Sequence, residues 1–219
     1  MRRFFVLVAL ALTVALSGVD VARAAQPPSL VNGGFVRRST SEKTFTAEDR
    51  ARLGELGLGK PSSAVIILRK IPRSEGPRQL ARLDALARSP EGFAPSGACD
   101  EMVGQGESSA LCSGHVSGPI GNVPVRMPVA ARLKHGSDGS VHLSLFNPKP
   151  LEVKSLLSWS SVVSPEHLQV SYELFPDPDG WLVYVRIGVE MSAHEGSATT
   201  ISDAMLKLEA WLTHELAKA

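Results

Sequence analysis

The chain has 219 residues, of which 43% are hydrophobic and 21% charged, and this length and apolar content favour a single domain with its own core. Its 23 basic and 22 acidic residues give a formal net charge of +1. Nucleic-acid binding depends on a clustered excess of basic residues, so this balance argues against a nucleic-acid partner.

Residues 1–24 are typical of a cleaved signal peptide. Arg2 and Arg3 precede an apolar run over 4–16, which is shorter than the ~20 residues that a membrane-spanning helix needs. Small residues at 22–24 then suit a signal peptidase. We therefore expect export to the periplasm or the medium, with no transmembrane anchor after cleavage. An uncleaved membrane anchor is the alternative.

An amino-terminal extension is expected over 25–61, before the main domain. Residues 25–44 are polar and are expected to be irregular. Thr46 and Asp49 have the spacing of a helix start, which predicts a short helix over 47–56.

The main domain is expected over 62–219. Its first strand is predicted at 64–68, in a run rich in β-branched residues between two prolines. A short helix is predicted from Pro77, because proline suits a first helical position, and residues 89–92 end it.

Residues 92–122 are rich in glycine and serine, with one strand predicted near 109–116. This stretch holds Cys99 and Cys112, which we expect to form a disulfide because nearby cysteines in an exported chain usually pair. A bridge of this loop length stabilises a fold by roughly 3 kcal/mol. A redox pair or two metal ligands are the alternatives, although only His115 lies close enough in sequence to join them.

From residue 123 the hydrophobic residues alternate, which is the period of half-buried strands. This pattern predicts a hairpin with strands over 123–133 and 141–145. Proline cannot donate a ladder hydrogen bond, so Pro124 and Pro128 indicate that the first strand starts late or lies at an edge.

The alternation continues to the end of the predicted sheet, with strands over 153–163, 168–174 and 181–191. Arg186 alternates with the apolar residues of the last strand and is expected to face solvent. The apolar spacing over 201–216 predicts a closing amphipathic helix.

Three stretches resemble parts of a known family: residues 86–95 (LARSPEGFAP), the hairpin that joins YELF at 172–175 to LVYVR at 182–186, and the closing helix. With the element order, they resemble the helix-grip fold of the START and polyketide-cyclase-like superfamily over about residues 62–217. Residues 73–76 depart from the family pattern, which has an apolar-aromatic helix start there. The implied fold class is α+β, with a curved antiparallel sheet that wraps a long carboxy-terminal helix and a short helix at the amino terminus. Another small α+β sheet-and-helix domain is the alternative.

The resemblance implies an apolar cavity between the sheet and the closing helix. Its candidate lining residues are Met127, Leu143, Leu145, Trp159, Tyr172, Val185, Ile187, Met205 and Leu212. These side chains are expected to converge on the helix, either around a ligand or in a filled core.

Specific motifs for catalysis or metal binding are absent from the sequence. It has no Gly-x-Ser-x-Gly, no His-Glu-x-x-His and no glycine-rich phosphate loop, so we expect no metal and no cofactor. His135 and His142 flank the hairpin turn and are expected to form a solvent-facing pair, while Glu152 and Glu173 are expected on polar faces or in turns.

Three functions are compatible with this sequence. The first is an exported, non-catalytic domain that binds an apolar or amphipathic, lipid-like ligand between the sheet and the helix. The second is a structural or protein-interaction domain with a filled core. The third is a cyclase- or hydrolase-type enzyme of the same fold, which needs a polar cluster in the cavity, with His142 or Tyr172 as the first residues to test.

Overall fold

The computed structural model describes residues 34–39, 46–72, 76–118, 121–154, 158–191 and 195–218. The expected signal peptide at 1–24 lies outside these residues, so its cleavage stays a prediction. None of the helices in these ranges is long and apolar enough to cross a membrane.

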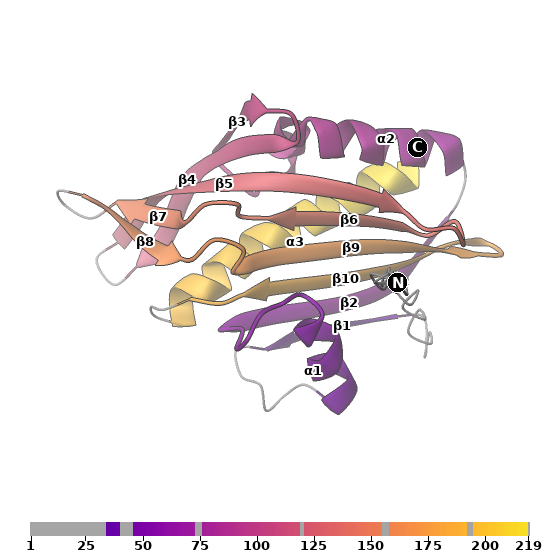
Figure 1. Cartoon of the computed structure of the whole chain (residues 1–219), viewed down its shortest axis with the longest axis horizontal. Helices are drawn as coiled ribbons and strands as arrows, with labels where there is room; N and C mark the ends of the chain where they lie inside the picture. Colours follow the sequence, from indigo (N-terminus) through magenta and orange to yellow (C-terminus); the bar gives the residue numbers. More distant parts are fainter. Residues whose placement is uncertain are drawn as a thin grey trace, which may run out of the picture.

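Ten strands form one antiparallel sheet (Figure 1). The strands are β1 (Gly34–Ser39), β2 (Ser63–Pro72), β3 (Glu101–Gly106), β4 (Ser109–Gly118), β5 (Gly121–His135), β6 (Val141–Phe146), β7 (Leu151–Lys154), β8 (Trp159–Val163), β9 (Leu168–Asp177) and β10 (Gly180–Val189). Their order is β1-β2-β10-β9-β6-β5-β4-β3, and the β7–β8 hairpin is attached to β5 through β7. The helices are α1 (Ala47–Gly54), α2 (Gly76–Arg88), the 3-10 helix η2 (Pro90–Ser96) and α3 (Glu195–Lys218).

Both faces of the sheet are covered around β2 and β10. On the inner face, Val65, Ile67 and Val185 belong to the main core, into which α2, η2 and α3 also pack. On the outer face, Ile66 and Tyr184 form a second core with α1. Burial on both faces explains why β2 is a continuous apolar run rather than an alternating one.

The start of α1 confirms the helix predicted from Thr46 and Asp49. The Thr46 hydroxyl accepts a hydrogen bond from the Asp49 amide at 3.1 Å, and the Asp49 carboxylate accepts one from the Thr46 amide at 3.1 Å. These reciprocal bonds form a capping box, with aspartate at the position that glutamate more often takes.

Several other predicted elements are confirmed, with shifted ends. The hairpin pairs β5 with β6, the last two strands pair as β9 and β10, and the strand expected near 109–116 is β4. Cys99 and Cys112 form the expected disulfide, which ties the segment between η2 and β3 to β4.

Residues 34–39 correct the expectation of an irregular lead-in over 25–44, because they form the edge strand β1, paired with β2. An edge strand is held by backbone hydrogen bonds and needs no apolar alternation to pair. The strand expected over 153–163 is also wrong as a single element, because β7 and β8 form two arms of a hairpin.

The expectation for Pro124 and Pro128 is wrong as well, because β5 starts before both prolines and lies inside the sheet. β5 pairs with β4 over 121–130 but with β6 only over 130–135. Along the proline-containing half, the far side of β5 is paired, among the described residues, only with the short strand β7. A proline nitrogen that faces this side therefore removes no ladder bond from the β4 pairing.

Candidate ligand-binding site

The second half of α3 is fastened to the inner face of the sheet by buried polar contacts. The Tyr172 hydroxyl of β9 lies 3.0 Å from the Thr213 hydroxyl, which donates to the Glu209 carboxylate at 2.8 Å. Arg69 of β2 donates to the same carboxylate at 3.2 Å. About two turns from the start of the helix, the Ser202 hydroxyl lies 2.8 Å from that of Ser63. These bonds hold α3 against β2 and β9.

Burial shifts the acid–base behaviour of this inner cluster. It raises the pKa of Tyr172 far above its ordinary value and raises the pKa of Glu209 as well, although Arg69 opposes the second shift. Tyr172 is therefore a neutral hydrogen-bonding group near neutral pH, which fits a structural role better than proton transfer.

On the opposite side of α3, a space of about 170 Å³ separates the first half of the helix from β4 and β5. The floor of this space is apolar and includes Val116, Val125, Met127 and Met205. The Cys112 arm of the disulfide also lines it. The space is therefore walled by the sheet, the bridge and the helix.

The rim of this space is polar and is formed by Asp100, His115, Asp203 and Lys207. His115 Nδ1 lies 2.7 Å from an Asp100 carboxylate oxygen, and Lys207 is exposed on α3. A polar rim over an apolar floor is the arrangement that suits an amphipathic molecule.

A second and much smaller space, of about 10 Å³, lies deeper along α3. Only apolar side chains line it, among them Phe93 of η2, Leu145 of β6 and Leu208 of α3. Met127 and Met205 line both spaces. The two methionines therefore form the boundary between the outer and the inner space.

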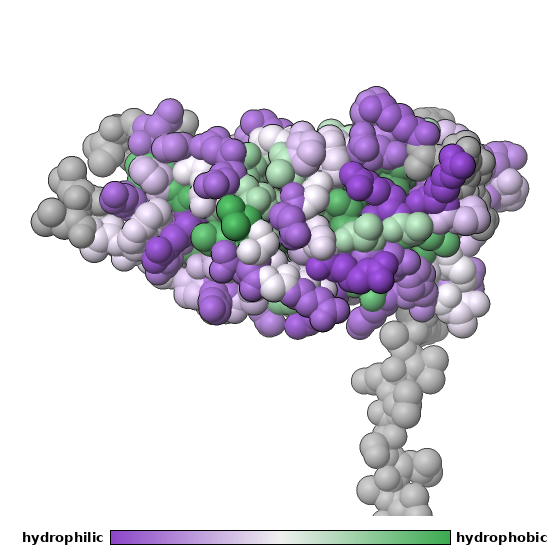
Figure 2. All heavy atoms as spheres, turned by 90° about the horizontal axis from the view of Figure 1, so that it is seen from above, coloured by the Kyte–Doolittle hydropathy of each residue, from purple (hydrophilic) through white to green (hydrophobic). Residues whose placement is uncertain are grey.

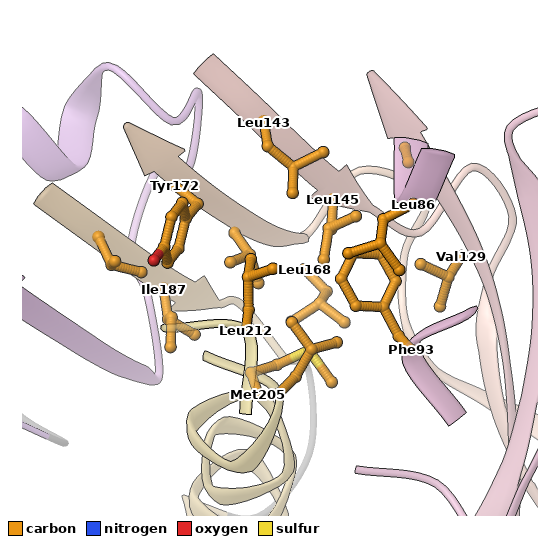
Figure 3. Close-up of a cluster of buried hydrophobic side chains, with 14 of the residues drawn as sticks. Leu86, Phe93, Val129, Leu143, Leu145, Leu168, Tyr172, Ile187, Met205 and Leu212 are labelled. Carbon is orange, nitrogen blue, oxygen red and sulfur yellow. The ribbon is translucent and has the colours of Figure 1, made fainter. Parts of the chain in front are cut away.

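Apart from Trp159, the expected cavity residues divide into two groups. Met127, Met205 and Leu145 line one or both spaces. The others are packed in the core, where Figure 3 shows Leu212 of α3 pointing toward the strands. This second group consists of Leu143, Tyr172, Val185, Ile187 and Leu212. The gap between sheet and helix is thus filled at one end and open at the other.

Trp159 was expected to converge with these residues, and the structure corrects this expectation. Its side chain is 37% exposed on β8 and lies against the guanidinium of Arg126, 4.4 Å from the ring centroid. The alternation that placed it on the inner face assumed one continuous strand, whereas β7 ends at Lys154 and a separate strand starts at Trp159.

Sequence reasoning missed three groups that shape the site: Phe93 at the inner space, and Asp100 and Lys207 at the rim. Phe93 and Asp100 lie in the glycine-rich stretch, where periodicity gives no signal. Lys207 lies on the predicted helix, but its position over the space depends on how the helix crosses the sheet.

Arg186 does not face solvent as expected, because α1 covers it on the outer face of the sheet. Its side chain is 5% exposed and forms ion pairs with Glu173 of β9 and with Glu55 after α1. The same guanidinium donates to the Arg52 carbonyl at 2.7 Å. Glu173, which was expected on a polar face or in a turn, is buried by the same contact.

His142 lies at the margin of this outer cluster. Its Nε2 is 3.0 Å from the Ser171 hydroxyl and 3.8 Å from Glu173. Burial lowers the pKa of His142, and the positive charges of Arg186 and Lys134 lower it further, while Glu173 opposes them. His142 and Tyr172, the first residues to test for catalysis, lie on opposite faces of the sheet and so do not form one catalytic site.

His135 does not contact His142 across the hairpin turn. It lies 3.4 Å from Asp84 of α2, while His142 points to β9. Across the described ranges, no group of three or more His, Cys, Asp or Glu side chains could hold a metal ion.

A wider hollow of about 900 Å³ lies beside α2, where β5 extends beyond β4. Charged residues of both signs line it, including Arg88, Arg132 and Asp84. On the face seen in Figure 2, hydrophilic residues likewise separate the smaller hydrophobic areas. The space between sheet and helix, which has an apolar floor, is therefore the better candidate for an apolar ligand.

The curved antiparallel sheet, with a closing helix packed across its inner face, has the helix-grip-like α+β arrangement predicted from the sequence. No family model and no curated protein matches the sequence. Among solved structures, the chain is similar to fragment 25–204 of the STAR-related lipid transfer protein from Xanthomonas axonopodis, with a TM-score of 0.45 and 13% identity. The match covers 87% of this chain and 97% of that one.

Proposed function

We propose that this domain binds an apolar or amphipathic, lipid-like molecule between α3 and strands β4 and β5, without catalysing a reaction on it. The observation that carries the proposal is the space of about 170 Å³ with an apolar floor and a polar rim. Its ionisable groups, such as His115 and Lys207, lie at the rim, where they suit a polar head better than acid–base chemistry at the floor.

The size of the space indicates how binding occurs. Pockets for small molecules usually measure about 300–1,000 Å³, so the ligand must displace side chains as it enters. Met127 and Met205 are suited to this movement, because the methionine side chain is unbranched and flexible. The hydrogen bonds from α3 to β2 and β9 confine the opening to the β4–β5 side.

The direct test is thermal unfolding with and without candidate ligands, together with solvent extraction of the purified protein. A ligand that binds only the folded state stabilises it by about 2.7 kcal/mol at a hundredfold excess over Kd. We expect a rise in Tm with at least one class of fatty acid or sterol, and lipid in the extract. An empty extract and an unchanged Tm with every apolar probe contradict the proposal.

A filled core is the competing interpretation, and two truncations on one helix distinguish the two. Leu212→Ala should lower the free energy of unfolding by about 2–5 kcal/mol, because Leu212 is packed on all sides. Met205→Ala should cost clearly less, because its side chain borders empty space and lacks some partner atoms. Equal losses in urea denaturation favour the filled core.

We also propose that the chain is exported to the periplasm or the medium. The charged, apolar and small-residue order of residues 1–24 supports this, as does a disulfide, which usually persists only in oxidising compartments. Mass spectrometry should find a mature protein that begins at or near Ala25. A membrane-bound form that retains Met1 overturns this proposal.

A further inference from the structure

Two methionines from different elements separate the outer space from the inner one. Met127 comes from β5 and Met205 from α3, and both side chains are almost fully buried. They are the residues that line both spaces. A change of rotamer at either one would join the two spaces, and neither side chain holds a hydrogen bond that such a change would break.

The two spaces follow one another along α3. The outer space contacts the helix from Thr200 to Lys207, and the inner space contacts it at Met205 and Leu208. Phe93 and Leu168 are among the apolar side chains that line the inner space. When the methionines move, the joined volume is therefore long and narrow, with polar groups at one end and an apolar wall at the other.

From this geometry we infer that the ligand is a single-chain amphiphile whose alkyl tail passes between Met127 and Met205 while its polar head stays at the rim. This inference rests on the proposed function and narrows its ligand class. An alkyl chain fits a narrow path in many conformations, whereas a rigid fused-ring molecule requires the whole width at once. The bonds that clamp α3 to β2 and β9 prevent the helix from moving away to provide that width.

The rim offers a polar head partners of both signs. Lys207 presents an ammonium group, while Asp100 and His115 present a hydrogen-bonded pair on the facing wall. The floor offers no charged partner, so a head drawn into it loses its water without compensation. The head must therefore remain outside, and the depth of the path sets the longest tail that fits.

The test measures Kd for saturated fatty acids from octanoate to stearate, below their micellar concentrations, with cholesterol as the rigid comparison. Each added methylene should lower Kd about fourfold while it still enters the apolar path. This decrease should stop, as a break in the series, at the chain length that reaches the apolar wall of the inner space. Cholesterol should bind at least tenfold more weakly than the best acid.

Four variants test whether Met127 and Met205 form a gate, that is, whether they control the passage from the outer to the inner space. Met127→Ala and Met205→Ala should shift the break to longer acids, and Met205→Phe should shift it to shorter ones. Met191→Ala is the matched control, because Met191 packs against the same core but lines neither space. The position of the break does not depend on how much each variant destabilises the fold, and Tm without ligand confirms that each variant is folded.

The outcomes separate this inference from the broader proposal. The single-chain inference is overturned if the break occurs at the same chain length in every Met127 and Met205 variant. It is also overturned if cholesterol binds as tightly as the best acid. Either result leaves the proposal of lipid binding intact. Failure of the wild-type protein to bind any acid or cholesterol overturns both.

Discussion

Arg186 is a buried cation that is paired with two carboxylates, those of Glu173 and Glu55. Arg186→Met should lower the free energy of unfolding by about 3–5 kcal/mol, because it leaves the buried Glu173 without its cation. Urea denaturation measures this loss. Lys218→Met removes the exposed pair with Glu215 and should leave the midpoint nearly unchanged.

A double variant shows whether the loss comes from the unpaired carboxylate. Combining Arg186→Met with Glu173→Leu removes both charges and should recover much of the stability, because hydrophobic residues often replace a buried ion pair without cost. A double variant as unstable as Arg186→Met alone would mean that packing against α1, and not charge, is what the arginine contributes.

His142 should make stability depend on pH below neutrality. The folded state holds its pKa below the ordinary value of 6.5, so the unfolded chain takes up a proton first as the pH falls. The free energy of unfolding should therefore decrease as the pH drops below about 6.5 and be fully regained above it. Glu173, Arg186 and Lys134 are the charged groups that influence this shift.

Urea denaturation at several pH values tests this dependence. His142→Gln should flatten the profile between pH 6.5 and the lowered pKa, whereas His214→Gln, at an exposed position on α3, should leave it as in the wild type. A wild-type slope that survives in His142→Gln would assign the effect to other groups.

Single residues also show what periodicity can and cannot predict. Met127 and Met205 were identified correctly as inward-facing, because alternation and helical spacing fix the face of an element. Arg186 was also placed correctly on the outer face, but alternation cannot tell that α1 covers that face. Trp159 was misplaced because the pattern runs unbroken in sequence across a change of strand.

At the level of elements, Gln79 of α2 joins three segments that close one end of the molecule. Its amide nitrogen donates to the carbonyls of Pro72 and Leu216, and its oxygen accepts from the Trp181 indole at 2.8 Å. Gln79→Leu removes the hydrogen bond to the buried Trp181 indole and those to the two carbonyls, and should cost about 1–3 kcal/mol.

Thermal unfolding and near-ultraviolet circular dichroism measure this effect, because the environment of Trp181 changes with it. Gln169→Leu is the matched control, since the Gln169 amide donates to a carbonyl at an exposed position. A Gln79→Leu variant that melts like the control contradicts this role.

Elements with a buried face were predictable, and those without one were not. The hairpin of β5 and β6, the strands β9 and β10 and the helix α3 all carry a regular apolar pattern. β1 and β3 carry little of it, because they lie at the two ends of the sheet and pair through their backbones. The resemblance to a helix-grip fold therefore predicted the central strands and the closing helix, but not the strands at the two edges of the sheet.

For the whole molecule, the Cys99–Cys112 bridge contributes both stability and a wall of the candidate site. Replacing both cysteines with alanine should lower the free energy of unfolding by about 3 kcal/mol, because the unfolded chain is no longer cross-linked. Urea denaturation measures the loss, and the wild type with reductant should match the variant.

Hydrogen exchange gives the location of the change. Amides of β3 and β4 should exchange faster in the double variant, whereas those of β2 and β10, on the far side of α3, should keep their protection. Uniformly faster exchange would show that the bridge supports the whole fold instead of the wall of the site.

The position of β2 in the sheet has a consequence for the order in which the molecule can be assembled. β2 lies between β1 and β10 in the sheet. During synthesis, β2 can therefore pair with its second neighbour only after residues 180–189 have been made. The inner face of β2 is covered later still, because α3 follows β10 in the chain. Folding of this kind depends on distant contacts and is slow. A growing chain therefore cannot complete the core around β2 until residues 180–218 have been made.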